Sequence, residues 1–365
     1  MYNTNYNHES IATTGILITN LGTPDAPTPQ ALKKYLGEFL WDRRVVSIPR
    51  PLWWLILNGV ILTTRPKKSA EAYKKVWTED GSPLLQIALK QKEKLQKHLD
   101  GISAAPVKVA LGMRYGTPSI ESALNELKAA NAQRIIVLPL YPQHSSATTA
   151  STFDAIGLAM KKAFWVPDLR FVSSYHDNPS FITALAQQIK NYWNKNGQAE
   201  KLFFSFHGMP ARTLPAGDPY FCHCHKTARL VAEQLGLEKD QWITAFQSRF
   251  GKEEWLKPYA DETLIKLGQS KLKSVDVVCP GFSADCLETL EEMAIENKET
   301  FQNAGGGEYR YIPALNDSDE HITALTNVIQ THTGDWPIWD KNWSMKIAQK
   351  NAKKTSQRAS ELSES

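Results

Sequence analysis

The chain alternates short apolar runs with longer amphipathic segments, and this alternation restricts the fold more than any other feature. In the clearest example, a strand predicted at Val107–Leu111 is followed by a helix to about Ala130 and a strand at Arg134–Leu140. Residues 112–116 are bounded by glycines and predict a loop, with Thr117 as the cap of the helix. A strand–helix–strand unit of this length predicts parallel strands joined by a right-handed crossover.

The same alternation recurs along most of the chain. Further strands are predicted at Gly15–Asn20, Leu169–Ser173, Leu202–Phe206, Trp242–Gln247, Val275–Cys279 and Tyr309–Pro313. Further helices are predicted at Pro29–Phe39, Ser69–Trp77, Pro83–Leu99, Ser180–Asn194, Thr227–Leu235, Tyr259–Leu267 and Asp285–Thr300. Two doubly wound α/β halves account for this pattern most simply. We therefore expect an N-terminal lobe at residues 12–170, a C-terminal lobe at 171–335 and a polar tail at 341–365.

Composition narrows the class of protein. In a chain of 365 residues, hydrophobic residues make up 42% and charged residues 22%, which is ordinary for a soluble globular protein. The net charge of +4 and the lack of a basic stripe argue against a nucleic-acid partner. The polar N-terminus does not resemble a signal peptide, and four cysteines do not suggest a disulfide scaffold. We expect a cytoplasmic protein.

Residues 49–62 (PRPLWWLILNGVIL) form the most apolar stretch, although it is too short to span a membrane. Cations stand before and after its apolar part, which begins at Leu52: Arg43, Arg44, Arg50, Arg65, Lys67 and Lys68. Such a segment is either a buried core helix or an interfacial element whose apolar side chains enter a bilayer. Two adjacent tryptophans between basic flanks favour the interface, and with it a peripheral contact with the inner face of the cell membrane.

A histidine stands at the end of a predicted buried strand. The apolar run Leu202–Phe206 is followed by His207, and Gly208 and Pro210 end the strand. In open α/β sheets ligands bind outside the carboxyl ends of the strands, so we expect His207 to face a cleft. For a histidine considered alone, a structural role is the competing interpretation.

An acidic segment follows another predicted strand. Asp285, Glu288 and Glu292 stand at i, i+3 and i+7, which predicts a row of carboxylates along one helical face, with Ser283 as the cap. The competing interpretation is a solvated acidic face. Together, His207 and Glu288 would form a labile site for a divalent metal such as Fe²⁺.

Other chemical motifs are weaker. The run Cys222-His223-Cys224-His225, with Cys279 and Cys286, allows a zinc or iron–sulfur cluster, but its spacing is poor and buried thiols are the alternative. No GxGxxG, P-loop, GxSxG or HExxH motif supports a dinucleotide, nucleotide, serine hydrolase or zinc protease site.

Four motifs in order resemble the ferrochelatase family: DGSPL after Tyr73, LGMRYGTP around Arg114, FSFHGMP around His207 and CPGFSADCLETLEE around Glu288. The resemblance spans about residues 14–320. It implies a chelatase-like α/β fold of two similar, doubly wound Rossmann-like lobes with parallel sheets, an active-site cleft between them and a lip at about residues 49–80. It also implies insertion of ferrous iron into protoporphyrin IX, giving protoheme and two protons in the terminal step of heme biosynthesis.

The resemblance further implies residue roles. His207 and Glu288 correspond to a facing catalytic pair proposed to bind the metal and accept pyrrole protons, and Asp285 and Glu292 to a proton or metal path. The implied porphyrin-binding residues are Leu21, Arg65, Tyr73, Arg114, Tyr115, Trp255 and Phe282, with Arg65 and Tyr73 near a propionate. Where some members carry a second histidine, this chain has Cys286.

Protoporphyrin IX and Fe²⁺ are the implied substrates, with no tightly bound cofactor. Some members bind a [2Fe–2S] cluster through C-terminal cysteines, but the tail from Lys341 onward contains no cysteine, so this cluster is not expected. A porphyrin carrier without turnover and a chelatase for another tetrapyrrole remain competing interpretations. The acidic segment argues against a carrier, since a carrier needs no proton path.

Overall fold

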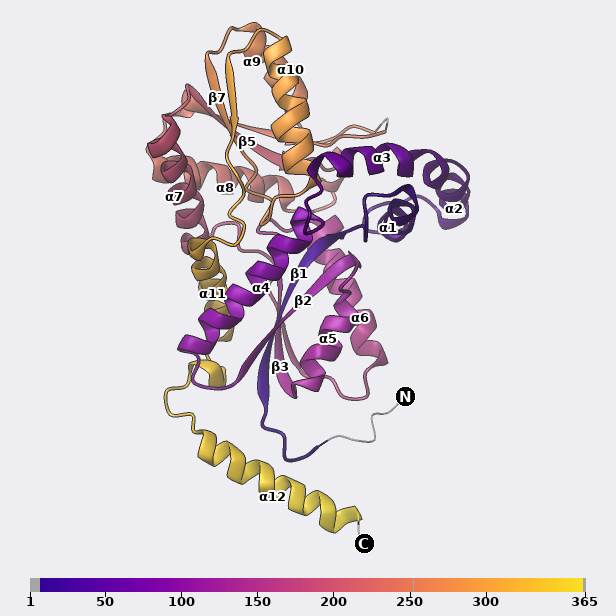
Figure 1. Cartoon of the computed structure of the whole chain (residues 1–365), viewed down its shortest axis with the longest axis vertical. Helices are drawn as coiled ribbons and strands as arrows, with labels where there is room; N and C mark the ends of the chain where they lie inside the picture. Colours follow the sequence, from indigo (N-terminus) through magenta and orange to yellow (C-terminus); the bar gives the residue numbers. More distant parts are fainter. Residues whose placement is uncertain (1–6, 252, 364–365) are drawn as a thin grey trace.

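The computed structural model describes residues 7–251 and 253–363, which form two parallel sheets covered by helices (Figure 1). The first sheet contains β1 (Thr13–Thr23), β2 (Val107–Gly116), β3 (Ala132–Pro139) and β4 (Asp168–Phe171). The second contains β5 (Lys201–His207), β6 (Trp242–Gln247), β7 (Ser274–Val278) and β8 (Glu308–Tyr311). All pairings between these strands are parallel, which confirms the predicted two-lobed α/β fold.

The two sheets share one strand order, β2-β1-β3-β4 and β6-β5-β7-β8. In each sheet, the first strand in the sequence lies between the second and the third. The chain therefore adds its second strand on one side of the first strand and its third strand on the other side. A crevice therefore opens at the carboxyl ends of the central strands, where the winding reverses. Each lobe has one such crevice.

Helices cover the sheets and join the strands. In the N-terminal half these are α1 (Pro29–Trp41), α2 (Arg50–Ile56), the π-helix η1 (Leu57–Ile61), α3 (Leu62–Val76), α4 (Pro83–Ile102), α5 (Ile120–Ala129), the π-helix η2 (Ser146–Ala150) and α6 (Ser151–Lys162). The C-terminal half contains α7 (Pro179–Asn196), α8 (Tyr220–Leu235), α9 (Ala260–Gln269), the π-helix η5 (Glu288–Glu296), α10 (Asn297–Asn303) and α11 (Asp319–Thr333). Short 3₁₀ turns lie at Ala211–Thr213, Lys239–Gln241 and Pro337–Trp339.

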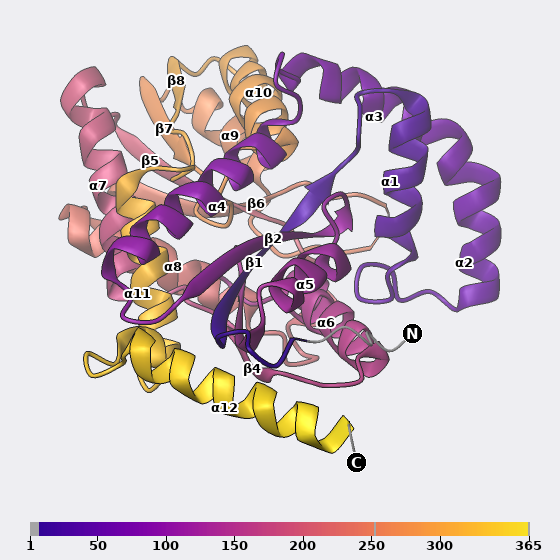
Figure 2. The same cartoon turned by 60° about the horizontal axis from the view of Figure 1, so that its bottom comes forward.

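One apolar core runs through both lobes. It contains Ile16 and Leu111 of the first sheet, Phe204 and Phe206 of the second, and Leu325 of α11. Helix α7 follows the first sheet but packs on α8, whereas α11 follows the second sheet but packs on α4 and β3. Figure 2 shows α11 beside α4, between the two lobes. This exchange of helices holds the lobes in a fixed relation.

Two local predictions were wrong. The expected loop at residues 112–116 is part of β2, which pairs with β1 as far as Gly116. A Cβ at Gly112 would lie 2.9 Å from Cα of Ile120, so this glycine permits close packing of α5 on the strand. Helix α5 is capped by Ser119, whose hydroxyl accepts from the Ser122 amide, and not by Thr117.

The acidic segment also differs from its prediction. The expected helix at residues 285–300 is a π-helix, η5, that begins at Glu288 and continues as α10. Asp285 precedes this helix, and the side chain of Ser283 does not cap it. Hence the i, i+3, i+7 row is broken at its first member.

Most of the predicted polar tail forms helix α12 (Met345–Ser363), which the sequence analysis did not predict. Its sequence is rich in Lys, Ala and Gln, which are good helix formers. In Figure 1, α12 extends away from the two lobes.

A buried ion pair stabilises the second sheet. The Asp276 carboxylate in β7 accepts hydrogen bonds from Arg310 Nε at 2.7 Å and Nη2 at 3.0 Å. It also accepts from Trp193 Nε1 at 2.7 Å and the Ala199 amide at 3.1 Å. The side chain of Asp276 is 0% exposed and that of Arg310 is 13% exposed. The pair thus connects β7, β8 and the end of α7.

We expect Asp276→Asn to lower the free energy of unfolding by about 3 kcal/mol, because the Arg310 charge would stay buried without its partner. Guanidinium chloride unfolding measures the change. The matched control is Glu254→Gln, which breaks the exposed pair with Lys257 and should leave stability nearly unchanged. An equal, small effect of both variants would contradict the prediction.

Candidate active site

A cavity of about 920 Å³ lies between the lobes at the carboxyl ends of strands from both sheets. Its walls include residues 20–23 at the end of β1 and residues from 140–148 after β3. Residues 207–210 and residues from 281–288, which follow β5 and β7, form the facing walls. These are equivalent strands of the two sheets, so the crevices at the two switch points open onto each other. The lobes therefore share one site.

His207 lies at the end of β5 and lines this cavity. Its Nδ1–H donates to the carbonyl oxygen of Gly208 at 2.7 Å, because a carbonyl oxygen can only accept. The neutral ring then carries its lone pair on Nε2. The backbone carbonyl of His207 accepts from the Tyr220 hydroxyl at 3.0 Å, which holds the strand end in place.

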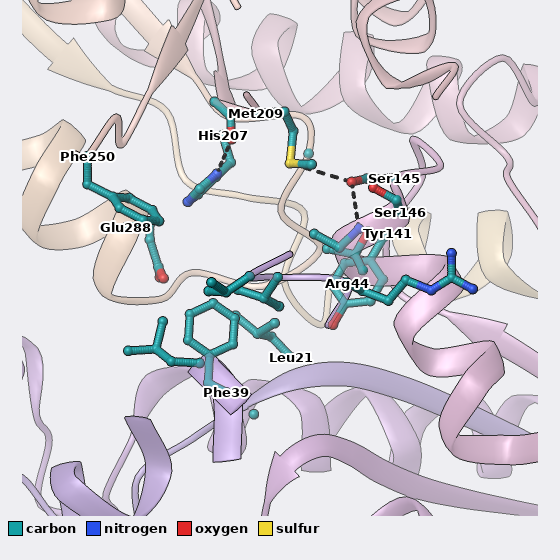
Figure 3. A pocket seen from close by; sticks show the side chains of 18 of the residues that line it. Leu21, Phe39, Arg44, Tyr141, Ser145, Ser146, His207, Met209, Phe250 and Glu288 are labelled. Atoms are coloured by element: carbon teal, nitrogen blue, oxygen red, sulfur yellow. Dashed lines mark hydrogen bonds between the residues drawn. The ribbon is translucent and has the colours of Figure 1, made fainter. Parts of the chain in front are cut away.

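Glu288, the first residue of η5, also lines the cavity, whereas Glu292 is held behind it. In the view of Figure 3, Glu288 lies at the same end of the cavity as His207, while Arg44, Tyr141, Ser145 and Ser146 lie at the other end. The Glu292 carboxylate accepts from the Ser248 amide at 2.7 Å and from the Ser248 hydroxyl. Ser248 has φ +64, a left-handed conformation that is uncommon for serine.

The pKa of Glu292 is raised above its usual value. Burial is the main cause, and the nearby charge of Glu288 adds to it, while the Ser248 hydroxyl and His207 act in the opposite direction. A carboxyl group of this kind can hold a proton close to the cavity.

Asp285 does not line the cavity. Its carboxylate accepts from the Tyr311 hydroxyl at 2.6 Å, from Asn316 Nδ2 at 2.8 Å and from the Thr289 hydroxyl at 3.0 Å. These bonds tie the segment before η5 to the segment after β8. The structure therefore separates Asp285 from His207 and Glu288.

Arg114 and Tyr115 lie behind the cavity wall and are not among the described residues that line it. The Arg114 guanidinium pairs with Asp42 and donates to the Ser151 hydroxyl at 2.7 Å. The Tyr115 hydroxyl donates to the same Asp42 carboxylate at 2.9 Å. Together these bonds hold Asp42 at the end of α1. The two residues that follow it, Arg43 and Arg44, line the cavity.

The other predicted porphyrin-binding residues line the cavity: Leu21, Arg65, Tyr73, Trp255 and Phe282. The Arg65 guanidinium lies 5.7 Å from the centroid of the exposed Phe250 ring, so the lip touches the opposite lobe. Sequence reasoning missed Arg43, Arg44, Tyr141, Met209 and Phe250, which also line it. The rule that ligands bind at the carboxyl ends of strands, which located His207, would also have found Tyr141. Tyr141 comes shortly after the end of β3, just as His207 stands at the end of β5.

The apolar segment of the lip has one buried side and one exposed side. Trp53 and Leu57 are buried, and Trp53 Nε1 donates to the carbonyl oxygen of Leu40 at 2.7 Å. The opposite side is exposed: Leu52 54%, Trp54 55%, Leu55 60% and Val60 57%. No helix among the described residues is both long and apolar enough to cross a bilayer.

The Cys-His-Cys-His run lies at the start of α8 and contacts the loop after β3. His223 Nδ1 accepts from the backbone amide of His144 at 3.2 Å, and its ring stacks on His176 at 3.6 Å. Nearby, the Ser146 amide donates to Asp218 at 2.7 Å. Within residues 7–251 and 253–363, no three His, Cys, Asp or Glu side chains are arranged to hold a metal ion. The histidines of this region connect the lobes.

Comparison with known proteins identifies relatives. Residues 13–333 match the family model described as Ferrochelatase. A ferrochelatase from Thioalkalivibrio sulfidiphilus is 55% identical over 354 residues, covering 97% of this chain and 96% of the relative. A ferrochelatase from Nitrosococcus oceani is 52% identical with the same coverage, 97% and 96%. The solved structure of SirB from Bacillus subtilis with Fe³⁺ aligns with a TM-score of 0.53 and 12% identity over 90% of this chain and 99% of SirB, which supports the fold alone.

The stacking of His176 on His223 predicts a loss of stability in acid. Burial, followed by the neighbouring His223, lowers the pKa of His176 from 6.5 to about 4. The unfolded chain binds the proton at a higher pH than the native protein does, because the native protein disfavours the protonated ring. The neutral His176 ring therefore makes its full contribution to the free energy of unfolding above pH 6.5, and this contribution is lost as the pH falls from 6.5 towards 4. The loss should reach about 3 kcal/mol.

Urea unfolding at several pH values tests this contribution. His176→Gln should reduce the loss of stability between pH 6.5 and 4 by more than the control His98→Gln, on α4. It should not abolish the loss, because the buried His321, whose pKa is also lowered to about 4, still contributes. If the His176 variant and the unaltered protein lose stability in parallel, the assignment is wrong.

Proposed function

Because the chain belongs to the ferrochelatase family and inserts ferrous iron into protoporphyrin IX, we propose that metalation takes place in the cavity between its lobes. The reaction gives protoheme and two protons in heme biosynthesis. One observation carries the proposal: His207 and Glu288, from two strand ends of one sheet, open into the same largely apolar cavity. Iron is a substrate here, and we propose that the enzyme needs no tightly bound cofactor and no iron–sulfur cluster.

His207 is the proposed acceptor of pyrrole protons. The porphyrin must lose two N–H protons before its four nitrogens can bind iron. With Nδ1 donating to Gly208, the lone pair of the ring is on Nε2, so a proton received there leaves the Nδ1 hydrogen bond intact.

Glu288 is the proposed partner of His207 in binding iron, with Glu292 as the next group on the proton or metal path. A carboxylate and an imidazole with open positions hold Fe²⁺ loosely enough to release it to the ring. Glu292, whose pKa is raised mainly by burial, suits the storage of a released proton. We assign Asp285 to holding the segment before η5, because its oxygens already accept three side-chain hydrogen bonds.

The cavity walls suit a planar apolar ring. Leu21, Trp255 and Phe282 present hydrocarbon surface. Bending one pyrrole out of the plane exposes a nitrogen lone pair, and walls that bind the bent ring favour the transition state. Arg65 is the proposed partner of one propionate near Tyr73. Arg43 also lines the cavity, whereas the charges of Arg44 and Arg212 are paired with Asp154 and Glu253. Arg114 and Tyr115 would contribute indirectly, through Asp42 and the segment that carries Arg43 and Arg44.

We propose that the lip attaches the otherwise cytoplasmic protein to the inner face of the membrane. Exposed Leu52, Trp54 and Leu55 would enter the interface while neighbouring cations meet anionic headgroups. Protoporphyrin is poorly soluble in water, so a cavity beside the bilayer would receive it directly.

We expect the purified protein to convert protoporphyrin IX and Fe²⁺ to protoheme without oxygen, and His207→Ala to lower kcat by about 10²–10⁴-fold, because the general base is lost. Absorbance of the metalloporphyrin measures the rate, and porphyrin fluorescence shows whether the variant still binds the ring. Binding without turnover by the unaltered protein would indicate a carrier. Faster metalation of another tetrapyrrole, or of sirohydrochlorin with cobalt, would indicate a different chelatase.

Replacing Trp54 and Leu55 with Ser should weaken binding to anionic liposomes at least tenfold, because exposed apolar surface leaves the interface. Sedimentation with the liposomes measures binding. Trp53 is unsuitable as a target, since it is buried and hydrogen bonded. The control pair, Phe153→Ser with Leu158→Ser, removes exposed apolar side chains from α6 and should leave liposome binding unchanged. Unaltered binding by the lip variant would refute the attachment.

A further inference from the structure

Gln247 is the last residue of β6, and its backbone fits closely against the residue after His207. His207 and Gln247 are register partners in the pairing of β5 with β6. The Gly208 amide donates to the carbonyl oxygen of Gln247 at 2.7 Å. A Cβ at Gly208 would lie only 2.6 Å from that oxygen, so this approach requires glycine. The position of Gln247 is therefore tied to the strand end that carries His207.

The side-chain amide of Gln247 joins this strand end to the π-helix. Its Oε1 accepts from the Ser205 hydroxyl in β5 at 2.6 Å and from Cys279 Sγ, just after β7, at 3.7 Å. Its Nε2 donates to the backbone carbonyl of Glu288 at 2.9 Å and to the Glu292 carboxylate at 3.3 Å. Donors thus face the amide oxygen and acceptors face the amide nitrogen, which defines one orientation.

Burial makes this link difficult to replace with water. Gln247 is 3% exposed, and Ser205 is 0% exposed. In such surroundings each lost partner leaves a buried polar group unpaired. Gln247 is not among the described residues that line the cavity, so it lies behind the site and has no direct contact with a ring bound there.

We infer that Gln247 is a positioning residue that sets the place of Glu288 relative to His207 and thereby governs iron insertion but not porphyrin binding. One amide group connects the strand that carries the imidazole with the first residue of η5, which carries the carboxylate. Removing the amide frees the start of η5 while the apolar walls that hold the porphyrin remain. This inference rests on the roles proposed above for His207 and Glu288.

The test separates binding from insertion. Gln247→Met keeps the length of the side chain but removes both the donor and the acceptor. We expect kcat divided by KM for Fe²⁺ to fall by about 10–100-fold, as for other groups that orient metal ligands. The Kd for protoporphyrin IX, measured by quenching of protein fluorescence without iron, should change less than twofold. Gln247→Leu also removes both the donor and the acceptor, so it should show the same split and serves if the Met variant does not fold.

A matched control removes a structural glutamine at the opposite end of a sheet. Gln96 Nε2 donates to the Val107 carbonyl at 3.1 Å, and its Oε1 accepts from the Val109 amide at 2.7 Å. Gln96→Met should leave both the insertion rate and the porphyrin Kd unchanged.

Two results would overturn the inference: full insertion activity of both Gln247 variants, or a loss of porphyrin binding in proportion to the loss of insertion. If the unaltered protein bound porphyrin but did not insert iron, the proposed catalytic roles would fail instead, which is a distinguishable outcome.

Discussion

Parallel strands joined by helices all end at the same edge of their sheet, and in this protein two such edges face each other across one cavity. The shared apolar core enforces this arrangement, because α7 and α11 each pack against elements of the lobe that they do not follow in sequence. The lobes cannot be displaced without exposing that core. The shared cavity depends on this constraint, since His207 and Tyr141 line the same cavity only because the strand ends of the two sheets face each other.

Two layers build the site. The inner layer is mostly hydrocarbon, with His207 and Glu288 at one end and arginines elsewhere along the wall. The outer layer is a set of hydrogen bonds that does not touch the cavity. It includes Gln247 behind the π-helix and Asp42 behind the segment that carries Arg43 and Arg44. This division lets the inner surface stay apolar for a porphyrin while the polar side chains beside it remain oriented.

Particular residues show how far sequence reasoning reached. The positions of His207 and Glu288 after buried strands were predictable, because strand order and right-handed crossovers place such ends at one edge. Asp285 was misplaced because spacing of i, i+3 and i+7 assumes a regular α-helix, whereas the segment begins with a turn and continues as a π-helix. Arg114 was expected in the cleft, yet the structure pairs it with Asp42, which is distant in sequence and carries no pattern that marks it.

The sequence by itself determined the class of fold, the two lobes, the ends of the strands that carry chemistry and, through its motifs, the family. These features follow from local periodicity and short-range spacing, which act over a few neighbouring residues. Only the tertiary structure decided which carboxylates reach the cavity, which tryptophan of the lip is exposed and which glutamine joins His207 to Glu288. Those outcomes depend on contacts between residues far apart in the chain, such as Ser205 with Gln247 and Gln247 with Glu288, and local periodicity carries no information about them.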